Sequence, residues 1–260
     1  MKSFDELINV VKRLRSKNGC PWDRKQTHKS LKPYLIEESY ELLQAIDKKN
    51  SFEIMDELGD VLLQVLLHAQ ILEEKGKFTI EDVVRNLKEK MIRRHPHVFS
   101  SLKAKGVDKI WQNWEKIKSK EKSSKSILDS IPRSLPALYR ADKTQKKAAR
   151  VGFDWNNVAG AWEKVFEELG EIKEIMGKTP LNKKKLAEEI GDLLFSIVNV
   201  ARKIGLNSEE TLQNSIEKFS KRFGRIEKYC KRKNINIQDC TLDELEKLWQ
   251  KAKSNGKMLT

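Results

Sequence analysis

Residues that make turns, disulfides and metal–thiolate sites are scarce in this sequence. Its 260 residues include only 12 Gly, 6 Pro and 3 Cys. So few turn-forming residues argue against a β-sandwich, which needs a turn after each short strand, and favour long helices. Cys20, Cys230 and Cys240 are odd in number, far apart and without a CxxC pair, so neither a disulfide framework nor a zinc site is predicted.

Long apolar segments are also missing. No run of roughly eighteen apolar residues occurs, and the stretch Met1 to Glu6 lacks the hydrophobic core of a secretory signal. We therefore expect a cytoplasmic protein that makes no membrane contact.

Charge, in contrast, is abundant. Asp, Glu, Lys and Arg make up 35% of the residues, and the formal net charge is +14. The excess of Lys and Arg lies mainly in residues 101–150 and 201–260, which fits nucleic acid, polyphosphate substrates or a lysine-rich solvated surface. Because no nucleic-acid-binding motif accompanies the charge, most of these lysines are expected at the surface, and nucleic acid is not expected as a partner.

Two acidic pairs lie about twenty residues apart. Glu168 and Glu171 are three residues apart, and so are Glu189 and Asp192; residues at this spacing share a helix face. Two such helices lying antiparallel would bring four carboxylates together, where each raises the pKa of the others. A hard divalent cation, Mg²⁺ or Mn²⁺, would resolve this conflict. A solvated acidic face is the structural alternative.

The same arrangement occurs twice, with an offset of about 130 residues. Four matching elements in the same order indicate the repeat of a whole helical domain. We predict an all-α fold of two tandem helical-bundle domains, residues 1–118 and 134–260, joined by a Lys/Ser-rich linker at 119–133. The matching pairs are Glu38 and Glu41 with Glu168 and Glu171, Glu57 and Asp60 with Glu189 and Asp192, Lys90 and Arg94 with Lys218 and Arg222, and Trp114 and Lys118 with Trp249 and Lys253.

Apolar spacing and capping signals place the helices. The first runs for about four turns from Phe4, the second has Pro33 in its first turn, and residues 19–23 break the chain between them. Asn50 and Thr79 are predicted to cap the next two helices. In the second repeat, helices are expected over 134–149, 157–176, 181–204 and 208–233, followed by a short helix that Thr241 and Glu244 cap.

Cationic and aromatic side chains accompany the second acidic set. Lys164 precedes Glu168 by one helical turn, as Lys185 precedes Glu189. Carboxylates that hold Mg²⁺, cations that bind phosphate oxygens and an aromatic plane that stacks on a base together suit a nucleoside triphosphate. Because bound metal acidifies water, hydrolytic phosphoryl or nucleotidyl transfer is the expected reaction. The remaining members of this set are Lys218, Arg222, Trp249 and Lys253.

The motif Glu-Glu-x-x-Glu followed by Glu-x-x-Asp, present twice, resembles the MazG family of nucleoside triphosphate pyrophosphohydrolases. Further stretches resemble signatures of that family in order through nearly the whole chain, so the match covers both repeats. They are Cys20-Pro21-Trp22-Asp23 with Gln26-Thr27-His28, Arg94-His95-Pro96-His97-Val98-Phe99, Val151-Gly152-Phe153-Asp154-Trp155 and Lys218-Phe219-Ser220-Lys221-Arg222-Phe223.

The resemblance implies tandem helical bundles, a homodimer, and hydrolysis of nucleoside triphosphates to the monophosphate and pyrophosphate by attack of water on the α-phosphorus, in housecleaning of nucleotide pools. Base preference, the number of Mg²⁺ ions and the carboxylate that activates water stay open. The implied Mg²⁺ ligands and catalytic residues are Glu168, Glu171, Glu189 and Asp192. The implied nucleotide contacts are Lys164, Glu167, Glu168, Lys185, Glu188, Asp192, Lys218, Arg222 and Trp249. Lys253 is added to these predicted contacts because it lies four residues after Trp249 and shares its helix face.

The first repeat departs from this pattern. Tyr34 stands at the position of Lys164, and Glu53 at that of Lys185, so two cations are lost and a charge that repels phosphate is gained. We therefore expect the second domain to be the main catalyst and the first to handle triphosphate poorly. Asp56 replaces Glu188, and the acidic set Glu38, Glu41, Glu57 and Asp60 is intact as a second possible metal site.

Other classes of protein fit the sequence less well. A di-iron carboxylate bundle wants Glu-x-x-His pairs, and here the partner is Glu or Asp. A basic helical scaffold or nucleic-acid-binding regulator remains the alternative function, although it has no need of two acidic sets. His95 and His97 are expected to cap or pack rather than bind metal, and Trp111, Trp155 and Trp162 to lie in the core or an interface.

Overall fold

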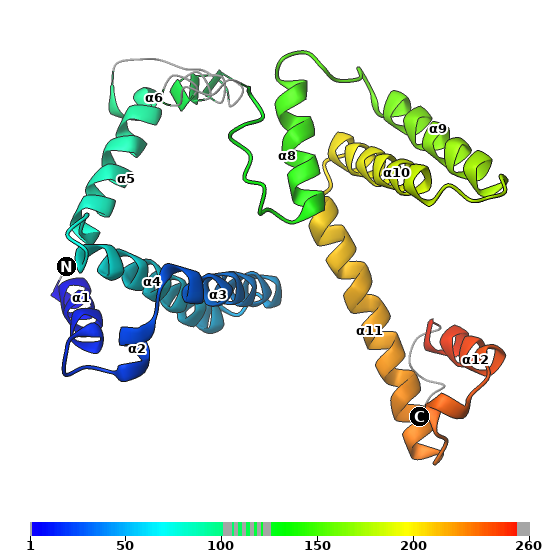
Figure 1. The fold of residues 1–260 in the computed structure, drawn as a ribbon, viewed down its shortest axis with the longest axis horizontal. Coiled ribbons are helices and arrows are strands. Elements are labelled where there is room, and N and C mark those ends of the chain that lie inside the picture. Colours follow the sequence, from blue (N-terminus) through cyan, green and yellow to red (C-terminus); the bar gives the residue numbers. More distant parts are fainter. Residues whose placement is uncertain are drawn as a thin grey trace. The chain divides into compact units, whose positions relative to one another are not determined.

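Helices form all the regular structure in the described part of the chain. The computed structural model describes residues 2–100, 106, 109–110, 113–114, 117–118, 121 and 126–253, and these contain no strand (Figure 1). The predicted all-α class is therefore confirmed. Two compact units, residues 1–123 and 124–260, make up the chain. The domain bounds of 1–118 and 134–260 stay predictions, and Trp111 lies outside the described residues, as does most of the Lys/Ser-rich run.

The first unit is organised around two long helices. α3 (His28–Lys48) packs along α4 (Ser51–Glu73), and α1 (Lys2–Arg15) and α5 (Ile80–Arg94) both pack on α4. This unit also contains the short helices α2 (Pro21–Lys25) and α6 (Pro96–Phe99). Its buried core consists of Val11, Leu31, Leu66, Leu67, Ala69, Ile71 and Ile80. In the described residues of either unit, no helix has both the length and the apolar character that crossing a bilayer requires.

Polar side chains cap these helices where the sequence indicates. Asn50 accepts hydrogen bonds from the backbone of Phe52 and Glu53, and Thr79 forms a capping box with Asp82. Both predicted caps are confirmed. His95 ends α5, with its Nδ1 2.7 Å from the carbonyl oxygen of Met91, which is the local role expected of it.

The predicted start of the second helix at Pro33 is wrong. α3 begins at His28, and Pro33 lies inside it. Thr27 and Ser30 form a capping box that satisfies the free backbone donors of the first turn, and this outweighs the one backbone hydrogen bond that proline removes. The predicted break at residues 19–23 likewise contains the start of a short helix, α2, with Pro21 at its first position.

A buried arginine ties the connection between α1 and α3 to the end of α4. The Arg15 guanidinium binds the two carboxylate oxygens of Glu74 at 2.8 and 2.9 Å, and it also donates to the carbonyl oxygens of Asp23 and Gln26. The hydrogen bonds from Arg15 lower the pKa of Glu74. Because a buried cation is stable only with such acceptors, this arginine fixes the path of the chain into α3.

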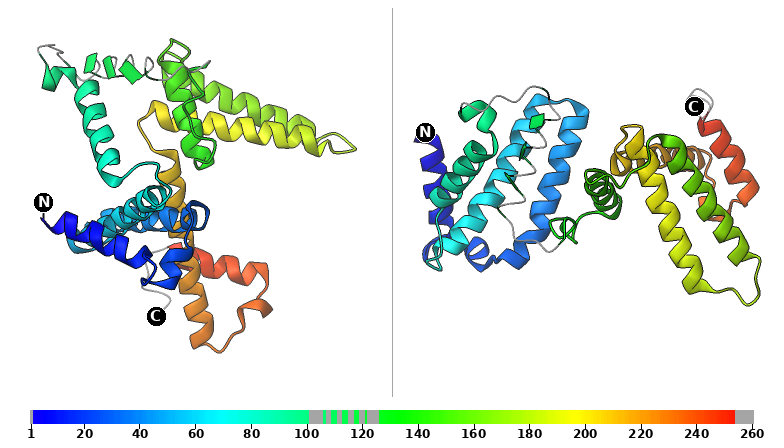
Figure 2. Two further views of the ribbon diagram at one scale, coloured as in Figure 1. Left: turned by 60° about the vertical axis from the view of Figure 1, so that its left-hand side comes forward. Right: turned by 90° about the horizontal axis from the view of Figure 1, so that it is seen from above.

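The second unit repeats the long helix pair. α9 (Val158–Met176) packs along α10 (Lys183–Lys203), and both views of Figure 2 show them side by side. α8 (Ala137–Ala149) packs on α10 and on α11 (Ser208–Arg232). After the single 3₁₀ turn η1 (Ile237–Asp239), α12 (Leu242–Lys253) folds back on α11. The predicted cap at Thr241 and Glu244 is confirmed by reciprocal hydrogen bonds of 2.8 and 3.4 Å.

An ion-pair cluster joins the segment before α9 to the end of α10. Arg202 donates to both carboxylate oxygens of Asp154, at 3.1 and 2.6 Å, and to the side-chain oxygen of Asn199. Lys203 lies 2.9 Å from the same Asp154 carboxylate. The Arg202 hydrogen bonds hold the pKa of Asp154 below its usual range. This cluster closes the helix pair at the end opposite to the turn between α9 and α10.

Three glycines lie inside α9 and α10 in different surroundings. A Cβ on Gly160 would come within 2.2 Å of the Trp155 ring, whereas Cβ atoms on Gly170 and Gly191 would meet nothing within 4 Å. Gly160 thus makes room for the indole that lies against the first turn of α9. Trp155 and Trp162 are 42% and 47% exposed, so neither is a core residue, and an interface role for them stays a prediction.

Candidate functional site

Three carboxylates meet between α9 and α10. Glu168, Glu189 and Asp192 each place an oxygen within 4.8 Å of the other two. Glu168 lies on α9, and the other two lie almost one turn apart on α10. Glu168 and Glu189 are buried, with 3% and 8% of their surfaces exposed, whereas Asp192 is exposed. We call this group acidic cluster 2.

The fourth predicted ligand lies beside acidic cluster 2. Glu171 is not among the three residues whose oxygens lie within 4.8 Å of one another, but it shares a hydrogen bond with the side chain of Glu189. Burial raises the pKa of Glu189, and the hydrogen bond and charge of Glu171 add to the effect. Two carboxylates in this arrangement favour a bound proton or cation between them.

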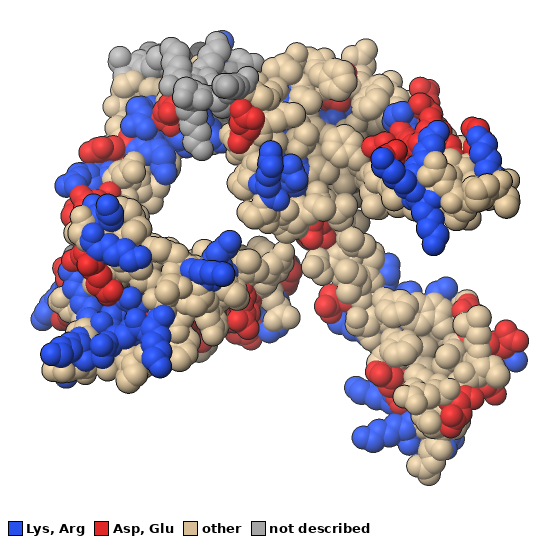
Figure 3. Space-filling view, in the orientation of Figure 1, with Lys and Arg blue, Asp and Glu red and all other residues tan. Residues whose placement is uncertain are grey.

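Lysines place positive charge at the same helix pair. Lys164 Nζ lies 2.9 Å from Glu167 and 2.8 Å from Glu168, and these hydrogen bonds raise the pKa of Lys164. The positive charge of Lys185 partly offsets the rise in the pKa of Glu189 that burial and Glu171 cause. Figure 3 shows Lys and Arg side chains among Asp and Glu side chains over α9 and α10. The predicted contacts Glu167 and Glu188 are exposed.

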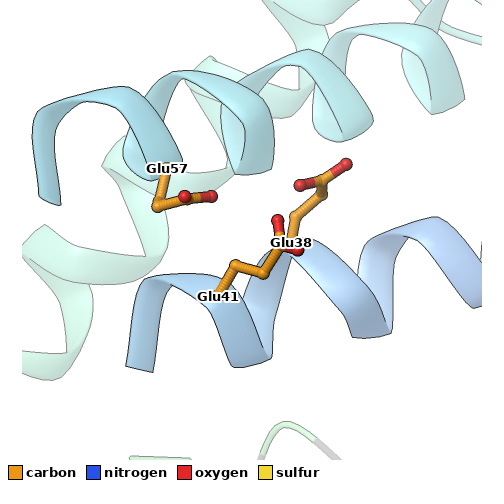
Figure 4. Close-up of side chains that lie close together, drawn as sticks. All are labelled: Glu38, Glu41 and Glu57. Atoms are coloured by element: carbon orange, nitrogen blue, oxygen red, sulfur yellow. The ribbon is translucent and has the colours of Figure 1, made fainter. Parts of the chain in front are cut away.

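The first unit has a corresponding group, which we call acidic cluster 1. Oxygens of Glu38, Glu41 and Glu57 lie within 4.8 Å of one another. Figure 4 shows Glu38 and Glu41 on α3 and Glu57 on α4, with their carboxylates toward the space between the helices. Burial raises the pKa of Glu38, and the negative charge of Asp60 is the next cause. Asp60 therefore lies near acidic cluster 1, as Glu171 lies near acidic cluster 2.

In the first unit, Tyr34 and Glu53 stand at the positions of Lys164 and Lys185, and both contribute to local structure. The Tyr34 ring packs edge-on against Trp22, with ring centroids 5.9 Å apart. Glu53 accepts hydrogen bonds from Lys48 at 2.9 Å and from Asn50 at 2.7 Å, at the start of α4. Neither side chain provides positive charge, so the surroundings of acidic cluster 1 are less suited to a triphosphate.

Both acidic clusters fit a hard divalent cation. Their ligand atoms are carboxylate oxygens, which suit Mg²⁺ or Mn²⁺ better than softer metals. Burial is the first cause of the raised pKa of Glu57, as of Glu38 and Glu189, and nearby carboxylates add to it in each case. A bound cation would remove that unfavourable interaction. Glu168, Glu189 and Asp192 would hold it in the second unit.

A basic cavity of about 350 Å³ lies on α11 and α12. Five cationic side chains against one carboxylate favour an anionic ligand there. Lys221 and Arg225 were not among the predicted residues, although their helical spacing from Lys218 places them on the same side of α11. The lining residues are Asn214, Glu217, Lys218, Lys221, Arg222 and Arg225 of α11 and Ala252 and Lys253 of α12.

Trp249 packs next to this basic cavity. Its ring lies 4.9 Å from that of Phe219, and the guanidinium of Arg222 lies over it at 5.9 Å. The ring also contacts the buried cluster of Ile226, Cys230, Leu248 and Ala252 that joins α11 to α12. A base-stacking role for Trp249 stays a prediction.

Acidic cluster 2 and the basic cavity lie on different helix pairs of the second unit. In Figure 1, α11 runs away from α9 and α10, and α12 packs on the distant part of α11. Lys218, Arg222 and Lys253 are therefore brought together with one another, but not with the carboxylates. Helical spacing predicts which residues share a face, but it does not predict where the next helix goes.

Comparison with known proteins defines the class of the chain. The model of a family described as MazG nucleotide pyrophosphohydrolase domain matches residues 26–99 and 159–225. These segments contain acidic clusters 1 and 2, so the predicted tandem repeat is confirmed. The chain belongs to the MazG family.

Named relatives span nearly the whole chain. A nucleoside triphosphate pyrophosphohydrolase/pyrophosphatase MazG of Thermotoga maritima is 48% identical over 252 residues, which is 96% of this chain and 95% of that protein. A nucleoside triphosphate pyrophosphohydrolase of Escherichia coli K12 is 41% identical over 257 residues, which is 97% of this chain and 98% of that protein. The uncharacterized protein YabN of Bacillus subtilis is 50% identical over 252 residues, or 96% of this chain and 51% of that longer protein.

Proposed function

We propose that this chain is a cytoplasmic enzyme that hydrolyses nucleoside triphosphates to the monophosphate and pyrophosphate, mainly in its second unit, as part of nucleotide-pool housecleaning. The observation that carries the proposal is acidic cluster 2, where three carboxylate oxygens lie within 4.8 Å of one another beside Lys164 and Lys185. Membership in the MazG family and the names of full-length relatives support the reaction class. Tyr34 and Glu53 replace these two lysines in the first unit, which supports the proposal that the second unit is the main catalyst.

The residues of the second unit would share the work of binding. Glu168, Glu189 and Asp192 would hold Mg²⁺, with Glu171 beside them. A bound Mg²⁺ would neutralise phosphate oxygens and make a water molecule more acidic. Lys164 would turn from its exposed partner Glu167 toward a phosphate oxygen, at little cost because that pair is solvated. Lys218, Arg222 and Lys253, which lie away from these carboxylates, would bind polyphosphate in the basic cavity, and Trp249 beside that cavity would stack on a base.

Product analysis with a panel of nucleoside triphosphates tests this proposal. With Mg²⁺ present, we expect equal amounts of nucleoside monophosphate and pyrophosphate, measured by ion-exchange chromatography. EDTA in excess of the metal is expected to abolish the reaction, and added Mg²⁺ or Mn²⁺ to restore it. Release of nucleoside diphosphate and orthophosphate would overturn the pyrophosphohydrolase assignment, and turnover that persists in EDTA would overturn the metal assignment.

We further infer a homodimer that covers an apolar face of α9 and α10. Contiguous exposed apolar side chains on a soluble domain are typical of an interface. Phe166 and Phe195 are 67% and 43% exposed, although both lie on helices that build the second unit. The other large apolar side chains exposed on these helices include Trp162, Leu169, Ile190, Leu194 and Ile197.

The Phe166→Glu variant tests the dimer. Sedimentation equilibrium is expected to give twice the chain mass of 30.2 kDa for the wild type and the single-chain mass for the variant, because a charge cannot be buried unpaired in an apolar interface. Leu242→Glu makes the same change at an exposed position of α12 and is expected to keep the dimer. A wild type of single-chain mass would contradict the inference.

A further inference from the structure

The arrangement of Arg222 over Trp249 recurs in the first unit. There the guanidinium of Arg94 lies over the Trp114 ring at 5.2 Å, and Lys118 Nζ lies over the same ring at 4.7 Å. The repeat offset equates Arg93 and Arg94 with Lys221 and Arg222, which line the basic cavity of the second unit. The first unit therefore has cations at positions that line the basic cavity in the second, and an aromatic ring at the position of Trp249 beside it.

A carboxylate of the chain itself is bound to these cations. Glu121 accepts hydrogen bonds from Arg94 at 3.1 and 2.5 Å and from Arg93 at 2.7 Å. Hydrogen bonds from Arg94, and then from Arg93, lower the pKa of Glu121 to about 2. The side chain of Arg94 is only 12% exposed, so its donors are largely taken up by the ring and by this carboxylate.

In the second unit, the cations equivalent to Arg93 and Arg94 are not bound to a carboxylate of the described residues. Among the described residues, no carboxylate forms an ion pair with Lys221 or Arg222, and the space in front of them is the basic cavity. The single acidic residue of its lining is Glu217. A planar guanidinium binds carboxylate and phosphate with the same two-pronged geometry. A carboxylate in this position therefore occupies the place that a phosphate group would take.

We propose that Glu121 is a specificity-determining residue that excludes polyphosphate from the first unit by binding Arg93 and Arg94 in its place. The proposal rests on the proposed function, because it takes the basic cavity of the second unit as the polyphosphate site. It adds a second reason for unequal units, separate from the loss of the two lysine positions beside acidic cluster 1. Removal of one carboxylate would then expose a second polyphosphate site in the same chain.

Calorimetric titration of the full chain with inorganic tripolyphosphate tests this proposal in metal-free buffer. The wild type is expected to bind one ion per chain, in the basic cavity. Glu121→Gln keeps the shape of the side chain and removes its charge, so this variant is expected to bind two. Adding Arg94→Met to Glu121→Gln should return the titration to one. Glu89→Gln removes the same charge from an exposed position of α5 and should leave one site.

The outcomes separate the two proposals. A Glu121→Gln variant that titrates like the wild type overturns the role of Glu121. No binding by the wild type but one ion per chain in Glu121→Gln supports the role of Glu121 and overturns the assignment of the basic cavity. If circular dichroism shows that Glu121→Gln loses helix, Glu121→Asp replaces it: its shorter arm should admit a second ion weakly, and one-site binding there overturns the proposal.

Discussion

The Glu189→Gln variant is expected to lose roughly 100-fold or more of kcat for nucleoside triphosphate hydrolysis, a loss typical of groups that stabilise charge at an active site. Glu189 is one of the three carboxylates of acidic cluster 2, and its neutral amide would be a poorer ligand for a hard cation. The measurement is steady-state release of pyrophosphate at saturating Mg²⁺. The wild-type rate in this variant would contradict the placement of the active site.

Glu57→Gln is the matched control in the first unit. Glu57 occupies the same repeat position and belongs to acidic cluster 1, so the two variants differ only in the unit that they alter. We expect Glu57→Gln to keep most of the activity. Equal losses in both variants would show that the units contribute equally and would contradict the proposed dominance of the second.

The same Glu189→Gln substitution is expected to make the metal-free protein more stable. Burial and the neighbouring carboxylates raise the pKa of Glu189, which means that its ionised form is less favourable in the folded chain than in the unfolded chain. At neutral pH the amide removes that unfavourable charge, so the midpoint of thermal unfolding in EDTA should rise. An enzyme site that gains stability when it loses activity is the expected mark of carboxylates held close together for a ligand.

Arg202→Met is expected to destabilise the second unit by roughly 2 kcal/mol, because it removes charge-assisted hydrogen bonds to Asp154 and leaves that half-buried carboxylate with Lys203 beside it. Arg202 donates to both oxygens of Asp154 and to Asn199, and only 10% of its side chain is exposed. Urea unfolding followed by circular dichroism measures the loss. Arg140→Met, at an exposed position of α8, is the matched control and should change stability by less than about 0.5 kcal/mol.

The cost of Arg202→Met should depend on pH in a defined direction. The pKa of Asp154 is lowered in the folded chain, so the pair stabilises the fold fully above the ordinary aspartate pKa of about 3.9 and stabilises it less as pH falls through the lowered value. The difference between wild type and variant should therefore be largest near neutral pH and shrink in acid. A difference that grows in acid would contradict the ion pair.

Most helices of the second unit could be predicted from local signals. α9, α10 and α11 each begin after an asparagine whose side chain accepts backbone hydrogen bonds, at Asn157, Asn182 and Asn207, and apolar residues recur at helical spacing between the caps. The start of α3 was missed because Pro33 is a stronger break signal than the Thr27 capping box that precedes it. Propensity is a local quantity, and here a specific pair of side chains overrides it.

The candidate site could also be predicted only in part from local sequence spacing. Residues three apart share one face of a helix, so the sequence could group Glu168, Glu171, Glu189 and Asp192 as candidates, and three of them meet in acidic cluster 2. The sequence was not enough to separate Glu171 from these three, because side-chain rotamers decide which oxygens meet. Glu121 and Arg94 are 27 positions apart in the sequence, and no periodic pattern relates them.

The glycines of α9 and α10 follow opposite substitution rules. A design that replaced each helix-interior glycine by alanine would gain up to about 1 kcal/mol of helix propensity per site where space is open, as it is at Gly170 and Gly191. At Gly160 the same methyl group would collide with the Trp155 ring, next to Asp154 and its arginine. Tolerance to mutation in this helix pair is therefore governed by free volume at each position and not by residue type.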